Sequence, residues 1–283
     1  MLSYQHVYHA GNHADILKHY VLTFVLNSLN KKEKPYTFFD THSGSGLYDL
    51  TDSRSLKTSE AEAGITKLLK QENAPEELKN YLDFVRTYTE KGFYPGSPEI
   101  ERAFMRQQDV LVLSELHPQE IENLKQNMNH TGTGMNANQE GAAKNPVVQI
   151  HKRDGWEMIK AMTPPETKRG GVLIDPSYEE DEDYENAAEA IIKVHKKWSS
   201  GIILLWYPLL EHREIEIKKM LDSITQAVHS VNVNTELENL QLCVNPKGSY
   251  RLYGSGMLVI NAPWKLKEEG ETVINYLGKI FGE

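Results

Sequence analysis

Cysteine is nearly missing from this chain of 283 residues, because Cys243 is the single one. A lone cysteine excludes an intramolecular disulfide and argues against a zinc site built from thiolates. It also suits the reducing conditions of a cytoplasm.

Long hydrophobic runs are missing as well. The longest, residues 201–210, is interrupted by Pro208 and is too short to span a bilayer. Residues 1–15 are polar and rich in histidine, without the basic flank and apolar stretch of a signal peptide. We therefore expect a soluble, cytoplasmic protein with no membrane partner.

Positive charge is also in short supply, since the formal net charge is −9 at pH 7. That sign opposes binding of nucleic acid through overall attraction. Basic residues nevertheless gather locally at residues 31–34, 152–153 and 196–197, and at Lys247 with Arg251. A nucleic acid would have to bind at such a patch, and we take Lys247 and Arg251 as the candidate RNA contacts.

What the chain does contain is a series of short apolar runs that alternate with helical patterns. An amphipathic helix is predicted over about 13–29. The apolar runs are rich in β-branched residues and leucine and lack polar alternation, which is typical of strands covered on both faces. They lie at residues 36–39, 110–113, 147–150, 172–174, 202–205 and 257–260. The pattern favours one α/β domain around a parallel, doubly wound sheet.

Two segments differ from this pattern. Residues 51–92 are polar and helix-forming, and apolar residues recur there at helical spacing from Leu78 to Tyr88. We interpret them as a helical subdomain inserted into a core formed by residues 1–50 and 93–283. Residues 129–145, rich in Asn, Gly and Ala, are expected to form a flexible loop.

In such a sheet, ligands bind at the carboxyl ends of the strands. The first strand is followed by the glycine-containing segment 40–46, where the backbone can approach a ligand closely. Glu115 follows the second strand and could accept hydrogen bonds from ribose hydroxyls, and Asp154 follows the third and could accept from an adenine amino group. An ordinary turn, an acidic helix cap and an N-cap are the respective alternatives.

The fourth strand is followed by Asp175-Pro176-Ser177-Tyr178, the most specific pattern in the sequence. It resembles the acidic or amide residue, Pro, Pro, aromatic motif of methyltransferases that modify exocyclic amines of bases. The N6 lone pair of adenine is delocalised into the ring, so acceptors such as Asp175 and the Pro176 carbonyl are needed to raise its nucleophilicity. Tyr178 would stack on the flipped base and align N6 with the methyl group. An ordinary Asp-Pro turn is the alternative.

Together these motifs resemble the RlmJ-type 23S rRNA adenine-N6 methyltransferase family. Further matching segments cover most of the chain and lie at residues 1–4, 9–15, 18–19, 40–46, 94–98, 114–118, 206–208 and 252–256. The family pattern has a second proline where this chain has Ser177, which adds a backbone donor and frees φ at the turn.

This resemblance implies a Rossmann-like S-adenosylmethionine-dependent fold with an inserted helical subdomain. The implied reaction methylates N6 of one adenine, at position 2030 of 23S rRNA, in RNA that is protein-free or early in assembly, with S-adenosylhomocysteine as product and no obligatory protein partner. Asp175, Pro176 and Tyr178 would be catalytic, and Tyr4 would help position the target base. The cofactor site would comprise His19, His42, Ser97, Glu115, Asp154, Gly155 and Asp175.

Other interpretations stay open at this point. A DNA adenine-N6 methyltransferase shares the motif, and a non-catalytic RNA-binding protein could retain the fold. The histidines at positions 6, 9, 13 and 19 invite a metal site, but no carboxylates at ligand spacing accompany them and methyl transfer needs no metal. We expect none.

Overall fold

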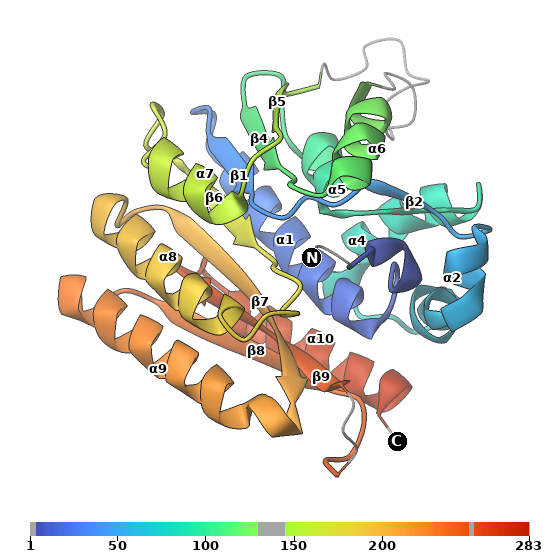
Figure 1. Ribbon diagram of the computed structural model, residues 1–283. Helices are drawn as coiled ribbons and strands as arrows, with labels where there is room; N and C mark the ends of the chain where they lie inside the picture. The colour runs from blue at the N-terminus through green and yellow to red at the C-terminus, as the bar shows by residue number, and fades with distance from the viewer. Residues whose placement is uncertain (1–3, 130–144, 249–251, 283) are drawn as a thin grey trace.

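The computed structural model describes residues 4–129, 145–248 and 252–282, and a seven-stranded sheet forms its centre (Figure 1). The strand order is β5-β4-β1-β6-β7-β9-β8. The strands are β1 (Thr37–Asp40), β4 (Val110–Ser114), β5 (Val147–His151), β6 (Gly170–Ile174), β7 (Ile202–Leu210), β8 (Leu237–Cys243) and β9 (Leu252–Ile260). The chain moves from β1 to β4 and β5, and then returns to β6 on the other side of β1. This reversal places the carboxyl ends of β1, β4 and β6 around the point where open α/β sheets bind ligands.

The sheet is mixed rather than wholly parallel. Strands β5, β4, β1, β6 and β7 are parallel, as predicted, but β9 runs antiparallel to both β7 and β8. Only residues 244–251 connect β8 to β9. So short a connection can join antiparallel neighbours, whereas a parallel crossover needs a dozen residues or more.

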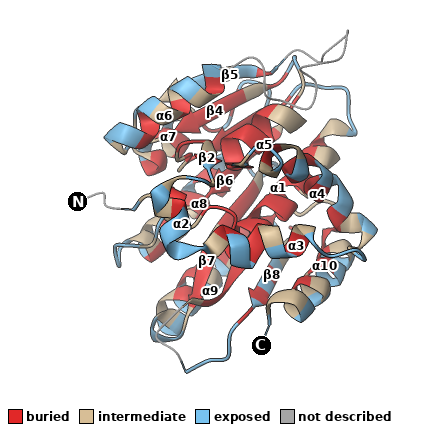
Figure 2. Cartoon of the chain, turned by 90° about the vertical axis from the view of Figure 1, so that its right-hand side faces the viewer, coloured by how far each residue is buried: buried red, intermediate tan, exposed pale blue. Residues whose placement is uncertain are grey.

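Helices cover both faces of the sheet, as Figure 1 shows. On one face lie α1 (His13–Asn30), α4 (Glu76–Thr89), α5 (Ser97–Phe104), α6 (Pro118–Asn129) and α10 (Leu266–Phe281), and on the other α7 (Gly155–Met162), α8 (Asp183–Lys197) and α9 (Glu214–Val231). Successive strand residues alternate between the two cores, so that Phe38 packs in the first and Phe39 in the second. The buried residues in Figure 2 follow the sheet and the inner helix faces. This three-layer arrangement confirms the predicted Rossmann-like fold.

Helix α1 is buried along most of its length. Its first turn is capped by the Asn12 side chain, which accepts a hydrogen bond from the Asp15 amide at 3.0 Å. Most of its buried side chains are apolar, but Asp15, Lys18 and His19 are buried as well. Charged groups in such a position need partners.

The segment between β2 (Leu47–Asp49) and β3 (Phe93–Pro95), an antiparallel pair, is helical. It contains α2 (Ser53–Thr58), a π-helix η2 (Glu62–Thr66), α3 (Lys67–Leu69) and α4; the short helices η1 (His6–Tyr8) and η3 (Glu211–Arg213) lie elsewhere. The residues at helical spacing on α4 are buried, as predicted, and join the same core as α1. The division into residues 51–92 and the remaining core stays a prediction.

The loop expected over residues 129–145 lies almost wholly outside the described residues. Its first residue, Asn129, ends α6, and Asn145 precedes β5. In the part of the chain that the structure describes, no helix combines the length and apolar character that crossing a membrane requires.

Candidate active site

A cavity of about 540 Å³ lies at the carboxyl ends of β1, β4 and β6. Its volume falls in the range of cofactor pockets. Most of the residues predicted for the site line it, namely Tyr4, His19, His42, Ser97, Glu115, Asp175, Pro176 and Tyr178. The fold therefore brings together residues from both ends of the chain and from the middle.

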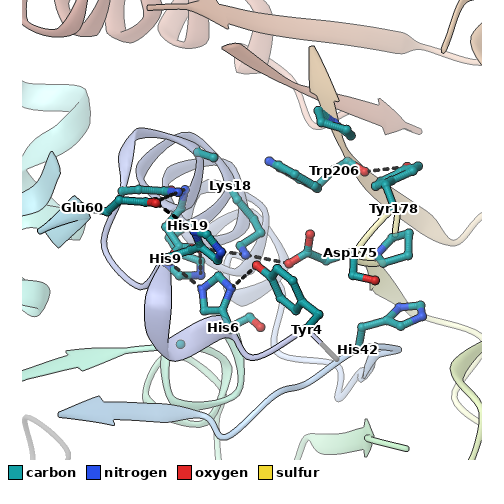
Figure 3. A pocket seen from close by; sticks show the side chains of 18 of the residues that line it. Tyr4, His6, His9, Lys18, His19, His42, Glu60, Asp175, Tyr178 and Trp206 are labelled. Atoms are coloured by element: carbon teal, nitrogen blue, oxygen red, sulfur yellow. Dashed lines mark hydrogen bonds and ion pairs between the residues drawn. The ribbon is translucent and has the colours of Figure 1, made fainter. Parts of the chain in front are cut away.

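Asp175 is held at the edge of this cavity by a buried lysine. The Lys18 ammonium donates to Asp175 Oδ2 at 2.6 Å and forms a second ion pair with Asp15 Oδ1 at 2.8 Å (Figure 3). Lys18 is 5% exposed and Asp15 is 1% exposed. One cation on α1 thus bridges two carboxylates and fixes the orientation of the motif acid.

The same network extends from Asp15 to the N-terminal segment. Asp15 Oδ2 lies 2.9 Å from His6 Nε2 and accepts from the Gly11 amide at 2.9 Å. His6 Nδ1 in turn lies 2.8 Å from the Tyr4 hydroxyl. The Tyr4 ring stacks on His9, with ring centroids 5.6 Å apart. Polar contacts therefore run from Tyr4 to Asp175, and the segment around Tyr4 lies over one side of the cavity (Figure 3).

The charges of this network stabilise one another. Burial alone would disfavour the Asp15 carboxylate, yet His6 and Lys18 hold the pKa of Asp15 well below its usual range. Burial would likewise disfavour the Lys18 ammonium, but the two carboxylates, Asp15 and Asp175, raise the pKa of Lys18. The Asp15 carboxylate and the Lys18 ammonium are therefore both charged at neutral pH.

Glu115 closes a second part of the cavity, beside the glycine-containing segment after β1. Its Oε2 accepts from the Gly44 amide at 2.8 Å and its Oε1 from the His117 amide at 2.7 Å. Gly44 has a φ of +59°, and a Cβ there would lie 2.3 Å from the Tyr48 hydroxyl. A carboxylate has about four lone-pair directions. The amides of Gly44, His117 and Leu116 take three of them, so one acceptor direction of the carboxylate is left for a ligand such as a ribose hydroxyl.

Ser97 and His42 meet at Asp40, the last residue of β1. Ser97 Oγ donates to Asp40 Oδ2 at 2.7 Å, and the His42 amide donates to Asp40 Oδ1 at 3.1 Å. Burial raises the pKa of Asp40 to about 7, although the bond from Ser97 opposes this. Burial also lowers the pKa of His42 to about 4, so its imidazole is neutral at pH 7. His42 packs edge-on against Trp156, with ring centroids 4.9 Å apart.

Asp154 and Gly155 are placed differently from the other predicted cofactor residues. Asp154 is the N-cap of α7 and accepts from the Glu157 amide at 2.9 Å, which was the structural alternative for this residue. A Cβ on Gly155 would lie 2.1 Å from the Thr41 carbonyl oxygen, so glycine permits α7 to approach the end of β1. Neither belongs to the described residues that line the cavity. Their contact with a cofactor stays a prediction.

Tyr178 is anchored to the core behind the motif. Its backbone is left-handed, with φ +54°, and its hydroxyl donates to the Trp206 carbonyl at 3.0 Å (Figure 3). Its ring packs against Tyr184 and Trp206, with centroids 4.7 and 6.0 Å away. Pro176 is buried and Ser177 is exposed. The anchored ring still lines the cavity, and stacking on a base stays a prediction.

The predicted RNA contacts lie apart from this network. Lys247 is exposed, pairs with Glu214 at 2.5 Å and lies over the Tyr253 ring, with its ammonium 5.5 Å from the centroid. Arg251 lies outside the described residues. Their role as an RNA patch is untested.

Sequence reasoning gave no role to Lys18, Asp15 or His6, which connect the predicted site residues. The sequence did contain one indication that these residues interact. Asp15 and Lys18 stand three residues apart in a helix whose middle turns are rich in large apolar residues, and charged residues in a buried helix are almost always paired. The partner of Lys18 could not be read from the sequence, because Asp175 is 157 residues away.

Comparisons with known proteins identify the family to which the chain belongs. A family model described as "Ribosomal RNA large subunit methyltransferase D, RlmJ" matches residues 33–283. Proteins named ribosomal RNA large subunit methyltransferase J are 36% identical to the chain in Escherichia coli, over 98% of this chain and 93% of that protein, and 36% identical in Haemophilus influenzae, over 99% and 94%. A crystal structure of protein LPL1258 from Legionella pneumophila superposes with a TM-score of 0.83 and 31% identity, covering 96% of this chain and 94% of that one. The chain therefore belongs to the RlmJ family of ribosomal RNA large subunit methyltransferases.

Proposed function

We propose that this protein transfers the methyl group of S-adenosylmethionine to N6 of one adenine in 23S rRNA. The observation that carries the proposal is Asp175, which is oriented by Lys18 at the edge of a cavity that Glu115 and Tyr178 also line. Family membership supports methylation of ribosomal RNA, and the names of both relatives specify the large subunit.

The residues of the cavity fit this cofactor. Glu115 keeps one free acceptor direction beside the glycine-containing segment, which suits a ribose hydroxyl. His19 Nε2 is buried and has no hydrogen-bond partner among the described residues, so a donor or acceptor is left for a ligand. When bound, the cofactor supplies an electrophilic methyl group on a sulfonium ion.

The residues around Asp175 prepare the amino group. Lys18 occupies Oδ2 of Asp175, which leaves Oδ1 to accept a hydrogen bond from N6 of the base. The Pro176 carbonyl is the second acceptor that we assign. Two acceptors localise the N6 lone pair and align it for an in-line displacement. As the N–C bond forms and the methyl–sulfur bond breaks, which leaves the sulfur as a neutral thioether, the amino proton would pass to Asp175 or to water.

Aromatic side chains provide a place for the flipped base. Tyr178 is fixed through its hydroxyl, and Tyr4 lies across the cavity from it (Figure 3). Stacking on such rings holds an extruded base in place. A neighbouring ring that is already anchored loses little entropy when the base binds.

The test compares methyl transfer to three polymers. Tritiated cofactor is incubated with protein-free 23S rRNA, with assembled large subunits and with duplex DNA, and the modified nucleotide is then mapped. We expect N6-methyladenine in protein-free 23S rRNA, at position 2030. Methylation of duplex DNA alone would favour the DNA methyltransferase, and RNA binding without methyl transfer would favour a non-catalytic protein.

A matched pair of variants tests the role of Asp175. Asp175→Ala should abolish turnover, because the acceptor at N6 is lost, while the protein still unfolds cooperatively at a lower temperature, because Lys18 keeps Asp15 as its partner. Asp222→Asn, an exposed carboxylate on α9 that pairs with Lys218, should leave turnover unchanged. Near-normal methylation by Asp175→Ala would refute the assigned role.

A further inference from the structure

A buried chain of hydrogen bonds connects His19 to two tyrosines. His19 Nδ1 lies 2.8 Å from the Tyr94 hydroxyl, which lies 3.1 Å from the Tyr81 hydroxyl. The three residues are 0%, 0% and 1% exposed. They come from three elements, namely α1, β3 and α4. Because the three side chains are buried away from water, each hydroxyl proton needs an acceptor within the protein.

The protons of this chain can be arranged in two directions. If Tyr81 donates to Tyr94 and Tyr94 donates to His19 Nδ1, both hydroxyl protons have an acceptor. In the reverse direction His19 Nδ1–H donates to Tyr94 and Tyr94 donates to Tyr81. The Tyr81 hydroxyl proton would then lack an acceptor, because among the described residues Tyr81 has no second hydrogen-bond partner. An orphaned buried donor is costly, so the first direction is preferred.

The other ring nitrogen of His19 supports the same direction. Nε2 lies 3.9 Å from Asp15 Oδ1, a carboxylate that the network keeps ionised. A lone pair on Nε2 would face this negative charge, whereas an N–H would be attracted by it. Burial lowers the pKa of His19 to about 3, so the ring carries one proton at neutral pH. That proton belongs on Nε2.

We propose that Tyr94 and Tyr81 are positioning residues that hold His19 as the Nε2–H tautomer, so that the ring presents a donor to an acceptor atom of the bound cofactor. His19 lines the cavity, and its Nε2 finds no hydrogen-bond partner within the described ranges. The second half of the proposal rests on the proposed function, since it takes His19 as a cofactor contact. Tyr81 belongs to the helical segment between β2 and β3, which is thereby given a part in cofactor binding.

The tautomer can be measured without any cofactor. Protein labelled with ¹⁵N-histidine gives proton–nitrogen correlations that separate pyrrole-type from pyridine-type nitrogens, and the signals missing from His19→Gln identify His19. We expect a pyridine-type Nδ1 and a pyrrole-type Nε2 in the wild type. In Tyr94→Phe the hydrogen bond to Nδ1 is lost, and only the weaker attraction of Asp15 at 3.9 Å still favours Nε2–H, so a mixture of tautomers should appear. A wild-type spectrum with the proton on Nδ1, or an unchanged spectrum in Tyr94→Phe, would overturn the relay.

Calorimetric titration with S-adenosylhomocysteine measures the consequence for binding. Tyr94→Phe should weaken binding on the order of tenfold, and Tyr81→Phe by a smaller factor, because the His19 ring is then no longer held with its donor toward the cofactor. Tyr276→Phe is the matched control, since its buried hydroxyl lacks a partner among the described residues. Equal affinities for Tyr94→Phe and Tyr276→Phe would overturn the link to the cofactor. A wild type that binds no S-adenosylhomocysteine would instead overturn the proposed function, while the spectrum still decides the relay.

Discussion

Asp15→Asn should destabilise the protein more than its modest chemical change suggests. Asp15 is 1% exposed and contacts three groups at 2.8 to 2.9 Å, namely the Lys18 ammonium, His6 Nε2 and the Gly11 amide. The asparagine has one acceptor oxygen for these donors, and its NH₂ group would add a further donor beside a buried ammonium. Lys18 would retain Asp175 alone.

The expected loss is about 3–5 kcal/mol at pH 7, the usual cost of breaking a buried ion pair by removing one partner. Urea denaturation measures it, and Asp222→Asn is the control. Asp222 pairs with Lys218 on the surface, with side chains 65% and 75% exposed, so its change should cost less than about 1 kcal/mol.

The pH dependence of this loss has a definite sign. The folded state lowers the pKa of Asp15 below its ordinary 3.8, so its ion pairs contribute stability above that pH and lose it as the pH falls further. The gap between wild type and Asp15→Asn should therefore narrow in acid. The reasoning fails if the variant loses less than about 1 kcal/mol at pH 7, or if the gap widens below pH 4.

Two further predictions concern Asp40 and Lys247. Burial raises the pKa of Asp40 from 3.8 to about 7, so the wild type should lose on the order of 4 kcal/mol of unfolding free energy as the pH rises through this window. Asp40→Asn should remove most of this pH dependence, measured by urea denaturation. Parallel dependences of the two proteins from pH 4 to pH 8 would contradict the assignment. If Lys247 exchanges Glu214 for an RNA phosphate, Lys247→Met should reduce the slope of log affinity against log salt by about 1, measured by filter binding, and an unchanged slope would remove Lys247 from the interface.

The sequence predicted the strands that contain an apolar run, which include the interior strands and the partly exposed edge strand β5. Strand β8, at the other edge, was missed because its apolar residues alternate with polar ones, with Leu240 and Leu242 buried between exposed residues. Strands β2 and β3 have three residues each, too few for any periodicity.

For the site, residues that follow strands could be predicted to meet, because the topology fixes where strands end. Glu115 and Asp175 reached the cavity for this reason. The contact between Lys18 and Asp175 depends on how α1 packs on the sheet, which no local pattern encodes. For Asp154 the sequence could not decide between two roles, because an aspartate after a strand can serve either as a helix N-cap or as a ligand contact.

The helices between β2 and β3 share their hydrophobic core with α1 instead of enclosing one of their own. Leu78 and Val85 of α4 pack in the cluster that also contains Ile16 and Tyr20 of α1. Excising residues 51–92 would therefore expose one side of the helix whose Lys18 orients Asp175. An engineer who wished to graft this insertion onto another methyltransferase would have to move α1 with it, as one unit.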